Sequence, residues 1–348
     1  MLIKKPTWLK KIIVFTFVLL LSVFVSCNQD SIFADIAVEP EPIDPRIKGS
    51  PSSIVELHNN IHVASLHSNS IHVYSISAGR WTSTIRAPDR ILSLAATDND
   101  LFVVTYSGNN HQNSILSIRS GSTWSSISLA SRPQVIYGSG SDLYIGTVNN
   151  IIRRQSDGSL SSLNINADLH GAAGSFIATS NGVYDNGAGP ISGTSGINIT
   201  GIIQANGVIF AVNRGGNLLR YNAGPSRFDQ IPNTSNSYTG AMAEWIPAGG
   251  GRTLLLLGVQ GTNNHNRGYR EINITNLANI STPYEPGTWE GSTVITANRS
   301  RYEASLARHS ITSILQIRPG NMIFASTGLN GLWSFKLRDG IWGWNAED

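Results

Sequence analysis

The chain has 348 residues and only one cysteine, Cys27. A chain with one cysteine cannot form an internal disulfide, so its stability must come from a hydrophobic core. The roughly 300 residues that follow Cys27 are enough to bury a sizeable core. We therefore expect a globular domain held together by apolar packing.

Charged side chains are also scarce, at 14% of the sequence. The first 26 residues hold four of the 25 basic residues and none of the 22 acidic ones, so the remainder has 21 basic against 22 acidic residues and a net charge of −1. Beyond residue 26, lysine occurs only at Lys48 and Lys336. This balance lacks the basic footprint of a nucleic-acid-binding protein, and no nucleic-acid partner is expected.

Long apolar runs are absent except for Ile12–Val25, which is interrupted only by Thr16 and Ser22. A helix of these 14 residues would reach about 21 Å, short of the ~30 Å hydrocarbon core of a bilayer. A short apolar run behind a basic N-terminus is typical of a secretory signal. The basic residues here are Lys4, Lys5, Lys10 and Lys11.

The segment Phe24-Val25-Ser26-Cys27 resembles the lipobox of bacterial lipoproteins, in a looser form like that of spirochaetes, with Phe24 where leucine is usual. The resemblance implies a signal peptide at residues 1–26 and fatty acyl chains such as palmitate on Cys27. Two or more such chains anchor a protein stably to a membrane. The expected location is thus the cell envelope, and Asn28 favours the outer membrane or periplasmic face, since inner-membrane retention in enteric bacteria uses aspartate there. The alternatives are an uncleaved anchor or ordinary secretion.

Residues 27–52 are expected to be the acylated cysteine and a tether. Pro40, Pro42, Pro45 and Pro51 fall within twelve residues. Closely spaced prolines favour extended chain and exclude a helix interior. The folded domain is therefore predicted at residues 53–348.

A β-rich run recurs along this domain, spaced by 33 to 68 residues and most often by about 40. Before each run there is often another short apolar run, and after each comes a third run with a Gly-containing turn, such as Ser156-Asp157-Gly158. No convincing 3.6-residue apolar period follows the signal peptide. The seven recurring runs are Ile61–Ser65, Leu101–Thr105, Leu143–Thr147, Phe176–Ser180, Ile209–Asn213, Leu255–Gly258 and Ile323–Thr327.

Four short strands per repeat of this length predict an all-β fold, a β-propeller with seven four-stranded blades. The fourth repeat, around Leu169–Ile191, has the weakest pattern because its glycines blur the strands. The widest gap, before Ile323, leaves room for an eighth, degenerate blade. A β-helix or a sandwich is the alternative, but neither requires a period near 40 residues.

Ser117–Trp124 resembles, weakly, the Asp-box turn of sialidase-like propellers, with Arg119 in place of its aspartate. The Asp-box is a structural hairpin turn, so the resemblance implies architecture and no hydrolytic activity. Blade endings typical of WD40 or kelch repeats are not found.

No motif assigns a cofactor, a metal or a catalytic residue. The chain has no phosphate-binding loop, no Gly-x-Ser-x-Gly elbow and no His-Glu-x-x-His helix. Asp98-Asn99-Asp100 is better explained as a turn than as a calcium loop, which needs six to eight oxygen ligands. Four histidines in the first repeat could only bind metal if their side chains converged, and we expect polar strand and turn positions instead: His58, His62, His67 and His72.

The segment at about 277–308 is an insertion between the sixth and seventh repeats. Long loops on a rigid scaffold often carry binding residues, and aromatic and arginine side chains are favoured interface anchors. The other explanation is a fourth strand plus a structural connection. The candidate binding residues are Tyr284, Trp289, Arg299, Arg301 and Tyr302, together with Arg308.

The leading hypothesis is a membrane-anchored envelope lipoprotein whose propeller binds a protein or a glycan, or serves assembly. An envelope glycan hydrolase or lyase is the first alternative, and it predicts acidic, Arg or Tyr side chains converging on the central channel. A structural surface protein without a specific ligand is the second. Fold alone does not choose among them.

Overall fold

The computed structural model describes residues 47, 51–108, 111–247, 251–260, 268–294, 299–304, 306–317, 321–328, 331–338 and 340–347. The compact unit begins at Pro45. Cys27 and the expected signal peptide lie outside the described residues. No helix among the described residues is long and apolar enough to cross a membrane.

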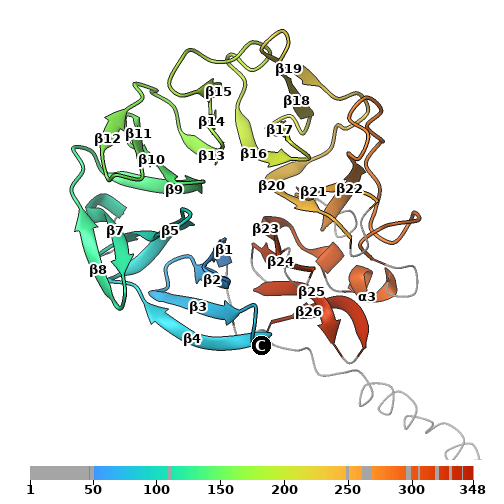
Figure 1. Ribbon diagram of the computed structural model, residues 1–348, viewed down its shortest axis with the longest axis horizontal. Helices are drawn as coiled ribbons and strands as arrows, with labels where there is room; N and C mark the ends of the chain where they lie inside the picture. Colours follow the sequence, from blue (N-terminus) through green and yellow to red (C-terminus); the bar gives the residue numbers. More distant parts are fainter. Residues whose placement is uncertain are drawn as a thin grey trace, which may run out of the picture. The chain divides into compact units, whose positions relative to one another are not determined.

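Seven antiparallel sheets, each built from consecutive strands, form a ring around one axis (Figure 1). The prediction of a seven-bladed β-propeller is confirmed, and the described part of the widest gap holds no eighth sheet. Blade one contains β1 (Pro51–Leu57), β2 (Asn60–Ser65), β3 (Ser70–Ser75) and β4 (Arg80–Arg86). Blade two contains β5 (Arg90–Ala96), β6 (Leu101–Tyr106), β7 (Ser114–Ser120) and β8 (Thr123–Ile127), with the short 3-10 helix η1 (His111–Asn113) before β7.

The next three blades follow the same order from the axis outward. Blade three contains β9 (Pro133–Ser139), β10 (Asp142–Thr147), β11 (Ile151–Arg154) and β12 (Leu160–Ser162). Blade four contains β13 (Leu169–Ala173), β14 (Phe176–Thr179) and β15 (Gly182–Asp185). Blade five contains β16 (Ile199–Ala205), β17 (Val208–Asn213), β18 (Leu218–Asn222) and β19 (Arg227–Gln230).

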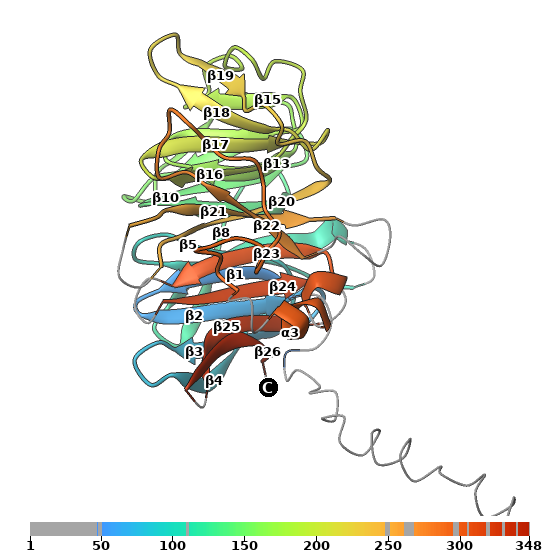
Figure 2. The same cartoon turned by 90° about the vertical axis from the view of Figure 1, so that its right-hand side faces the viewer.

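Blade six contains β20 (Tyr238–Trp245), β21 (Leu254–Val259) and β22 (Tyr269–Asn273), and blade seven contains β23 (Ile311–Ile317), β24 (Met322–Thr327), β25 (Leu332–Arg338) and β26 (Ile341–Ala346). Between them lie the helix α3 (Arg299–Ala304) and the 3-10 helix η3 (Leu306–Arg308), beside blade seven in Figure 2. The sequence pattern did not predict α3, because six residues are too few to show a helical period.

Blades four and six have three paired strands among the described residues, and a single bridge occupies the outer position of each. Pro190 bridges Tyr184 in blade four, and Tyr284 bridges Glu271 in blade six. Both outer segments are therefore reduced fourth strands. This explains the weak fourth repeat, because its glycine-rich outer segment makes one bridge where other blades make a ladder.

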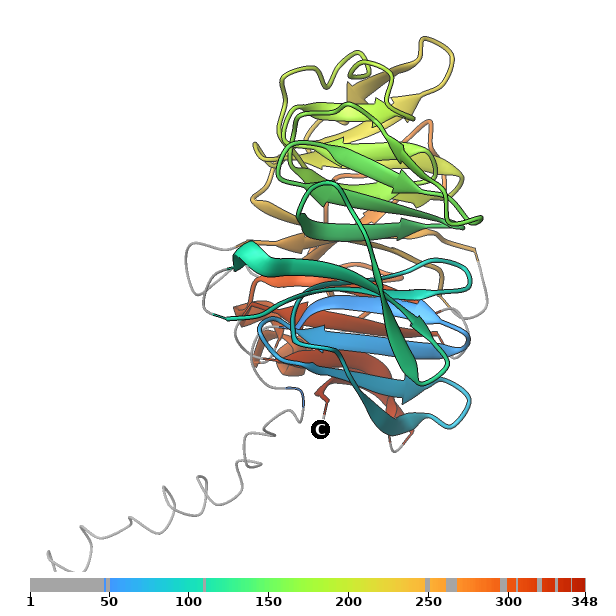
Figure 3. The same ribbon diagram turned by 90° about the vertical axis from the view of Figure 1, so that its left-hand side faces the viewer.

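The core consists of seven apolar clusters, one at each boundary between neighbouring blades. Alternate residues of β21 show the principle: Leu255 and Leu257 pack toward blade five, whereas Leu254 and Leu256 pack toward blade seven. Both faces of a second strand are thus buried, so its sequence is continuously apolar. Seen edge-on, the sheets lie one beside the next (Figure 2, Figure 3).

The ring closes without strand exchange, because blade one is entirely N-terminal and blade seven entirely C-terminal. Ile47, Tyr74 and Phe324 belong to the cluster that joins these two blades. Ile47 is 1% exposed and β1 begins at Pro51, so the folded domain starts a few residues before the expected boundary at Ser53. Ile47 therefore belongs to the core, although it lies within the expected tether at residues 27–52.

Candidate functional site

The axis of the ring is surrounded by the innermost strand of every blade, and these strands share a local irregularity. Near its beginning, the innermost strand of six blades carries one extra residue relative to its partner strand, and β20 of blade six carries two between Tyr238 and Met242. A small or β-branched residue follows the shift in six of the blades: Ser53, Ser93, Val135, Gly171, Gly201 and Ser313. The sequence analysis missed this recurrence, although a small residue followed by an aliphatic one could have marked it.

Small residues are needed here because neighbouring inner strands approach closely. A Cβ atom on Gly201 would lie 2.0 Å from the carbonyl oxygen of Gly240, and one on Gly138 would lie 1.7 Å from that of Ala96. No side chain is compatible with those distances unless the blades move apart. Glycine at these positions therefore sets the width of the axial opening.

A cavity of about 430 Å³ lies on the axis and is lined by all seven innermost strands. The described residues that line it include serines, threonines and aliphatic side chains, but no aspartate, glutamate, lysine or arginine. A glycan hydrolase or lyase was expected to place acidic and arginine groups here. Of the groups that this alternative requires, the described lining supplies only a tyrosine.

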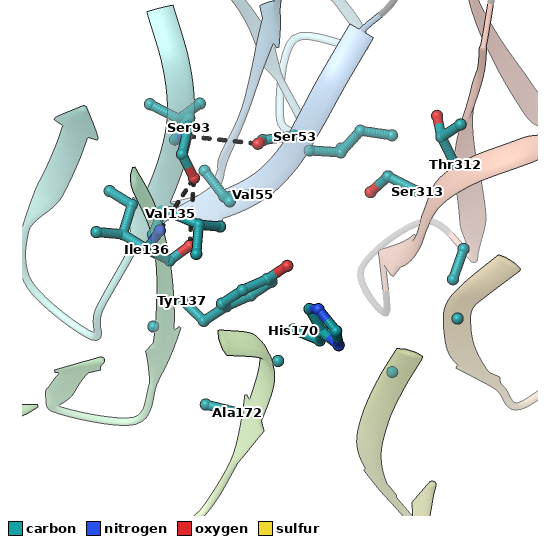
Figure 4. A pocket seen from close by; sticks show the side chains of 18 of the residues that line it. Ser53, Val55, Ser93, Val135, Ile136, Tyr137, His170, Ala172, Thr312 and Ser313 are labelled. Carbon is teal, nitrogen blue, oxygen red and sulfur yellow. Dashed lines mark hydrogen bonds between the residues drawn. The ribbon is translucent and has the colours of Figure 1, made fainter. Parts of the chain in front are cut away.

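Tyr137 and His170 are the titratable side chains of this lining, and they lie next to each other in Figure 4. The Nδ1 atom of His170 lies 2.6 Å from the carbonyl oxygen of Ile199, which links blade four to blade five. Burial deep in the channel raises the pKa of Tyr137 to about 12, so its phenol stays protonated at neutral pH.

Serine hydroxyls tie blades one, two and three together on the side of the cavity that carries Tyr137. Ser53 accepts a hydrogen bond from the backbone N–H of Leu94 at 3.4 Å. Ser93 accepts one from the N–H of Ile136 at 3.1 Å (Figure 4). These contacts fix the inner strands relative to one another.

A second candidate site lies on blade six and is organised by a buried carboxylate, Glu271, which is fully buried on β22. Its oxygens accept hydrogen bonds from the indole N–H of Trp289 at 2.8 Å, from the hydroxyl of Ser292 at 2.7 Å and from the N–H of Thr293 at 3.0 Å. Burial raises the pKa of this carboxyl group, and the hydrogen bonds from Thr293 and Ser292 oppose that shift. One carboxylate thus holds three residues of the insertion.

A directed chain of hydrogen bonds reaches the same carboxylate from blade seven. The indole N–H of Trp344 can only donate, and it lies 3.2 Å from the hydroxyl of Tyr269. Tyr269 then donates to the hydroxyl of Thr293 at 2.5 Å, and Thr293 donates to Glu271. Every donor in this chain points toward the Glu271 carboxylate. The chain therefore couples the insertion to blades six and seven.

Two aromatic residues of the insertion and an arginine from outside it form a surface that we term the blade-six platform: Arg252, Tyr284 and Trp289. The rings of Tyr284 and Trp289 stack at 5.1 Å with an interplanar angle of 24°. The guanidinium of Arg252 lies 5.7 Å from the Trp289 ring centroid and donates to the carbonyl of Glu290. Tyr284 is 36% exposed, while Trp289 is half-buried against the core.

The structure brings together only some of the residues proposed from the sequence. Tyr284 and Trp289 meet, whereas Arg252 comes from outside the insertion and was missed, since only the fold places it beside Trp289. Tyr302 is 4% exposed and packs in the core between blades six and seven, so it supports the insertion from within and does not offer a surface contact.

Of the arginines of the insertion, Arg299 and Arg301 lie on α3 and Arg308 ends η3. Arg299 bonds to Glu303 at 2.5 Å and lies 3.6 Å from Glu285, which also pairs with the buried Arg270 at 3.2 Å. Arg301 is part of the same helix, and its side chain lies outside the described residues. The described charges of the insertion are therefore largely engaged with one another.

The histidines of blade one do not converge. His62 pairs in register with Val73 while His72 pairs with Val63, so the two imidazoles lie on opposite faces of the hairpin and not opposite each other. Across the described residues, no group of three or more His, Cys, Asp or Glu side chains is placed to hold a metal ion. Asp98–Asp100 forms the turn between β5 and β6, as expected.

No protein family profile matches the chain, and no curated protein matches it in sequence. Similar solved structures include YCF48 bound to a D1 peptide, with a TM-score of 0.51 and 12% identity over 87% of this chain and 98% of that one. Hydrazine synthase of Kuenenia stuttgartiensis gives a TM-score of 0.54 and 12% identity, covering 86% of this chain and 99% of that one. A chain of the mitotic checkpoint complex gives a TM-score of 0.55 and 10% identity, covering 86% of this chain and 95% of that one. At these identities the likeness establishes the propeller fold alone.

Proposed function

We propose that this protein is a lipid-anchored component of a bacterial cell envelope whose propeller binds a protein partner through the blade-six platform. The observation that carries the binding role is the pair of stacked rings, Tyr284 and Trp289, beside the Arg252 guanidinium. Tyrosine, tryptophan and arginine are the residues most enriched at interface hot spots. The anchor rests on the lipobox-like segment that ends at Cys27.

Preorganisation supports this choice of surface. Trp289 is held by its hydrogen bond to the buried Glu271, and the backbone of Tyr284 pairs with that of Glu271 in both directions, at 2.9 and 3.0 Å. A side chain that is already fixed loses little entropy when a partner binds. The insertion therefore presents rigid anchors on and directly after the reduced fourth strand of blade six.

The fold neighbours support a macromolecular partner by analogy. YCF48 was solved with a bound peptide, and another neighbour is a chain of a multiprotein complex. A propeller of this kind offers wide surfaces made of loops from several blades. The same analogy would hold for a glycan partner, which the binding experiment must separate from a protein.

Affinity capture from an envelope extract tests the binding role, with soluble Asn28–Asp348 as the bait. Tyr284→Ala removes an exposed ring and keeps the backbone bridge to Glu271, so recovery of the partner should fall about tenfold or more. Ile115→Ala is the matched control, because Ile115 is 52% exposed on blade two, away from the platform. It should recover the partner like the unmodified bait.

Equal recovery by both variants would exclude the platform. Capture that survives protease treatment of the extract and is lost after glycan removal would move the assignment to a glycan. If no bait retains any partner, a structural surface protein or an envelope glycan hydrolase or lyase takes its place, and a glycan-cleavage screen of the same bait separates those two.

The anchor is tested separately with Cys27→Ser in the full chain. We expect the unmodified protein to incorporate a palmitate analogue and to remain with membranes after a high-salt wash, and the variant to lose the label. An unmodified protein that takes up no label and stays in membranes with an unprocessed N-terminus would instead indicate an uncleaved anchor. Release of both proteins into the soluble fraction would indicate ordinary secretion.

A further inference from the structure

The axial cavity carries polar groups that the proposed binding surface does not use. Each innermost strand pairs with its blade along one edge only, so its other edge turns backbone N–H and C=O groups toward the axis. Seven such edges surround about 430 Å³ of space, within the range of small-molecule sites. Some of these backbone groups already bond across blades, namely the N–H of Leu94, the N–H of Ile136 and the carbonyl of Ile199, and the others need water or a ligand as partners.

The charge of the lining restricts the ligand. No acidic or basic side chain occurs among the described lining residues apart from His170. An ionised ligand would leave its water shell without meeting an opposite charge, which is unfavourable. For an uncharged ligand rich in hydroxyl groups, leaving water costs less free energy. Its hydroxyls both donate and accept hydrogen bonds, so they can replace water at serine, threonine and backbone groups.

Two side chains of the lining, His170 and Tyr137, offer hydrogen-bonding groups to a ligand in the cavity. The carbonyl oxygen of Ile199 can only accept, so the Nδ1 atom of His170 carries the proton in their 2.6 Å contact. In the neutral imidazole Nε2 is then a hydrogen-bond acceptor. The phenol hydroxyl of Tyr137 makes no hydrogen bond with the described protein, and Figure 4 shows it beside His170 and facing the interior of the cavity.

We propose that this cavity binds an uncharged mono- or disaccharide. The Tyr137 hydroxyl donates to a sugar oxygen, the Nε2 atom of His170 accepts from a sugar hydroxyl, and the Tyr137 ring packs against the apolar face of the sugar. Ser313 adds a hydroxyl from blade seven, across the cavity in Figure 4. The site is distinct from the blade-six platform and does not depend on it.

Isothermal titration of the full-length chain tests this site, in a detergent whose headgroup is not a sugar. The probes are glucose, N-acetylglucosamine and maltose, with glucuronate as a charged counterpart of glucose. We expect at least one neutral sugar to bind with a dissociation constant in the millimolar range or tighter. Glucuronate should bind at least tenfold more weakly than glucose binds.

Tyr137→Phe removes only a hydroxyl that has no hydrogen-bond partner among the described residues, so the fold should persist while affinity for the sugar falls about tenfold. Tyr221→Phe is the matched control, since that hydroxyl meets Ser226 on blade five, away from the cavity, at 3.1 Å. Ser313→Ala is a second lining variant and should also weaken binding. A thermal melt of each variant establishes that it is folded.

The proposal is overturned if no neutral sugar binds, if glucuronate binds as tightly as glucose, or if both lining variants match the unmodified chain. None of these results bears on partner capture through Tyr284. Loss of sugar binding in Tyr137→Phe with retention in Tyr221→Phe would locate the site in the cavity.

Discussion

At the scale of single residues, buried polar groups explain how the insertion is fixed on blade six. Glu271 would be costly inside the protein if its oxygens were not saturated by donors. Trp289 donates to Oε2 and the backbone N–H of Thr293 donates to Oε1, so each oxygen faces an N–H that cannot reverse its role. The site depends on a carboxylate and not merely on a polar side chain of that size.

Replacing Glu271 by glutamine should therefore destabilise the protein in spite of the similar shape. Whichever way the new amide turns, its NH₂ group faces an N–H donor, and one buried donor is left unsatisfied. We expect a loss of about 1 to 3 kcal/mol in the free energy of unfolding, measured by urea denaturation. Glu303→Gln, on the exposed side of α3, is the control and should change little; an equal loss in both variants would contradict the argument.

His62 should make the stability depend on pH. Burial, and then the positive charge of Arg119, lower its pKa from 6.5 to about 4. Its Nδ1 atom also lacks a hydrogen-bond partner in the described structure. Between pH 4 and 6.5 the unfolded chain binds the proton more readily, so stability should rise with pH across this window and be lost as the pH falls, by up to about 3 kcal/mol.

The variant His62→Leu cannot titrate and also removes the unsatisfied ring nitrogen. Its free energy of unfolding, measured at intervals between pH 4 and 7, should show a smaller slope than that of the unmodified chain. Parallel profiles for the two proteins would exclude His62 as the source.

At the scale of elements, the innermost strands decide the geometry of the axis. Their beginnings shift register, and glycines such as Gly201 and Gly240 allow neighbouring strands to approach with backbone against backbone. An ordinary strand residue at these places would widen the cavity or separate two blades. The inner strands can therefore lie this close only because glycine places no side chain between them.

Gly201→Ala tests this at one blade boundary. The added methyl group would lie 2.0 Å from the carbonyl oxygen of Gly240, so blades five and six would have to separate, and we expect a loss of about 3 kcal/mol in urea denaturation. Gly189→Ala is the control, because no atom lies within 4 Å of its added methyl group. Comparable stability of the two variants would show that the inner strands yield easily.

At the scale of the whole molecule, the ring must close through side chains, because no strand is shared between blades one and seven. Glu347 is 1% exposed and accepts from the indole N–H of Trp81 at 2.9 Å. The ammonium group of Lys336 lies 2.7 Å from the same carboxylate and 5.4 Å from the Tyr74 ring centroid. The hydroxyl of Ser334 also donates to the Glu347 carboxylate. The described links across the closure include the Trp81 bond to Glu347, the Lys336 cation over the Tyr74 ring, the Tyr74 hydroxyl bond to Met322 and the apolar cluster around Ile47.

Glu347→Ala should therefore weaken the entire ring. The change leaves Lys336 buried without its counter-charge, and removal of one partner from a buried pair typically lowers stability by about 3 to 5 kcal/mol. Asp229→Asn alters the more exposed Arg227–Asp229 pair, where about 1 kcal/mol or less is expected. Tryptophan fluorescence during urea unfolding measures both; a small effect of Glu347→Ala would mean that the apolar cluster closes the ring alone.

The sequence by itself determined the blade repeat, because each second strand is buried on both faces and must be continuously apolar. It also determined many of the turns, such as Asp98–Asp100, since turn chemistry is local. The reduced outer strands of blades four and six and the helix α3 were decided by tertiary contacts, since one bridge or six residues leave no periodic pattern. The burial of Tyr302, the placing of Arg252 beside Trp289 and the neutral cavity with Tyr137 and His170 depend on residues far apart in the chain. Only the closed ring brings such residues together, because contacts between blades are not encoded in local alternation.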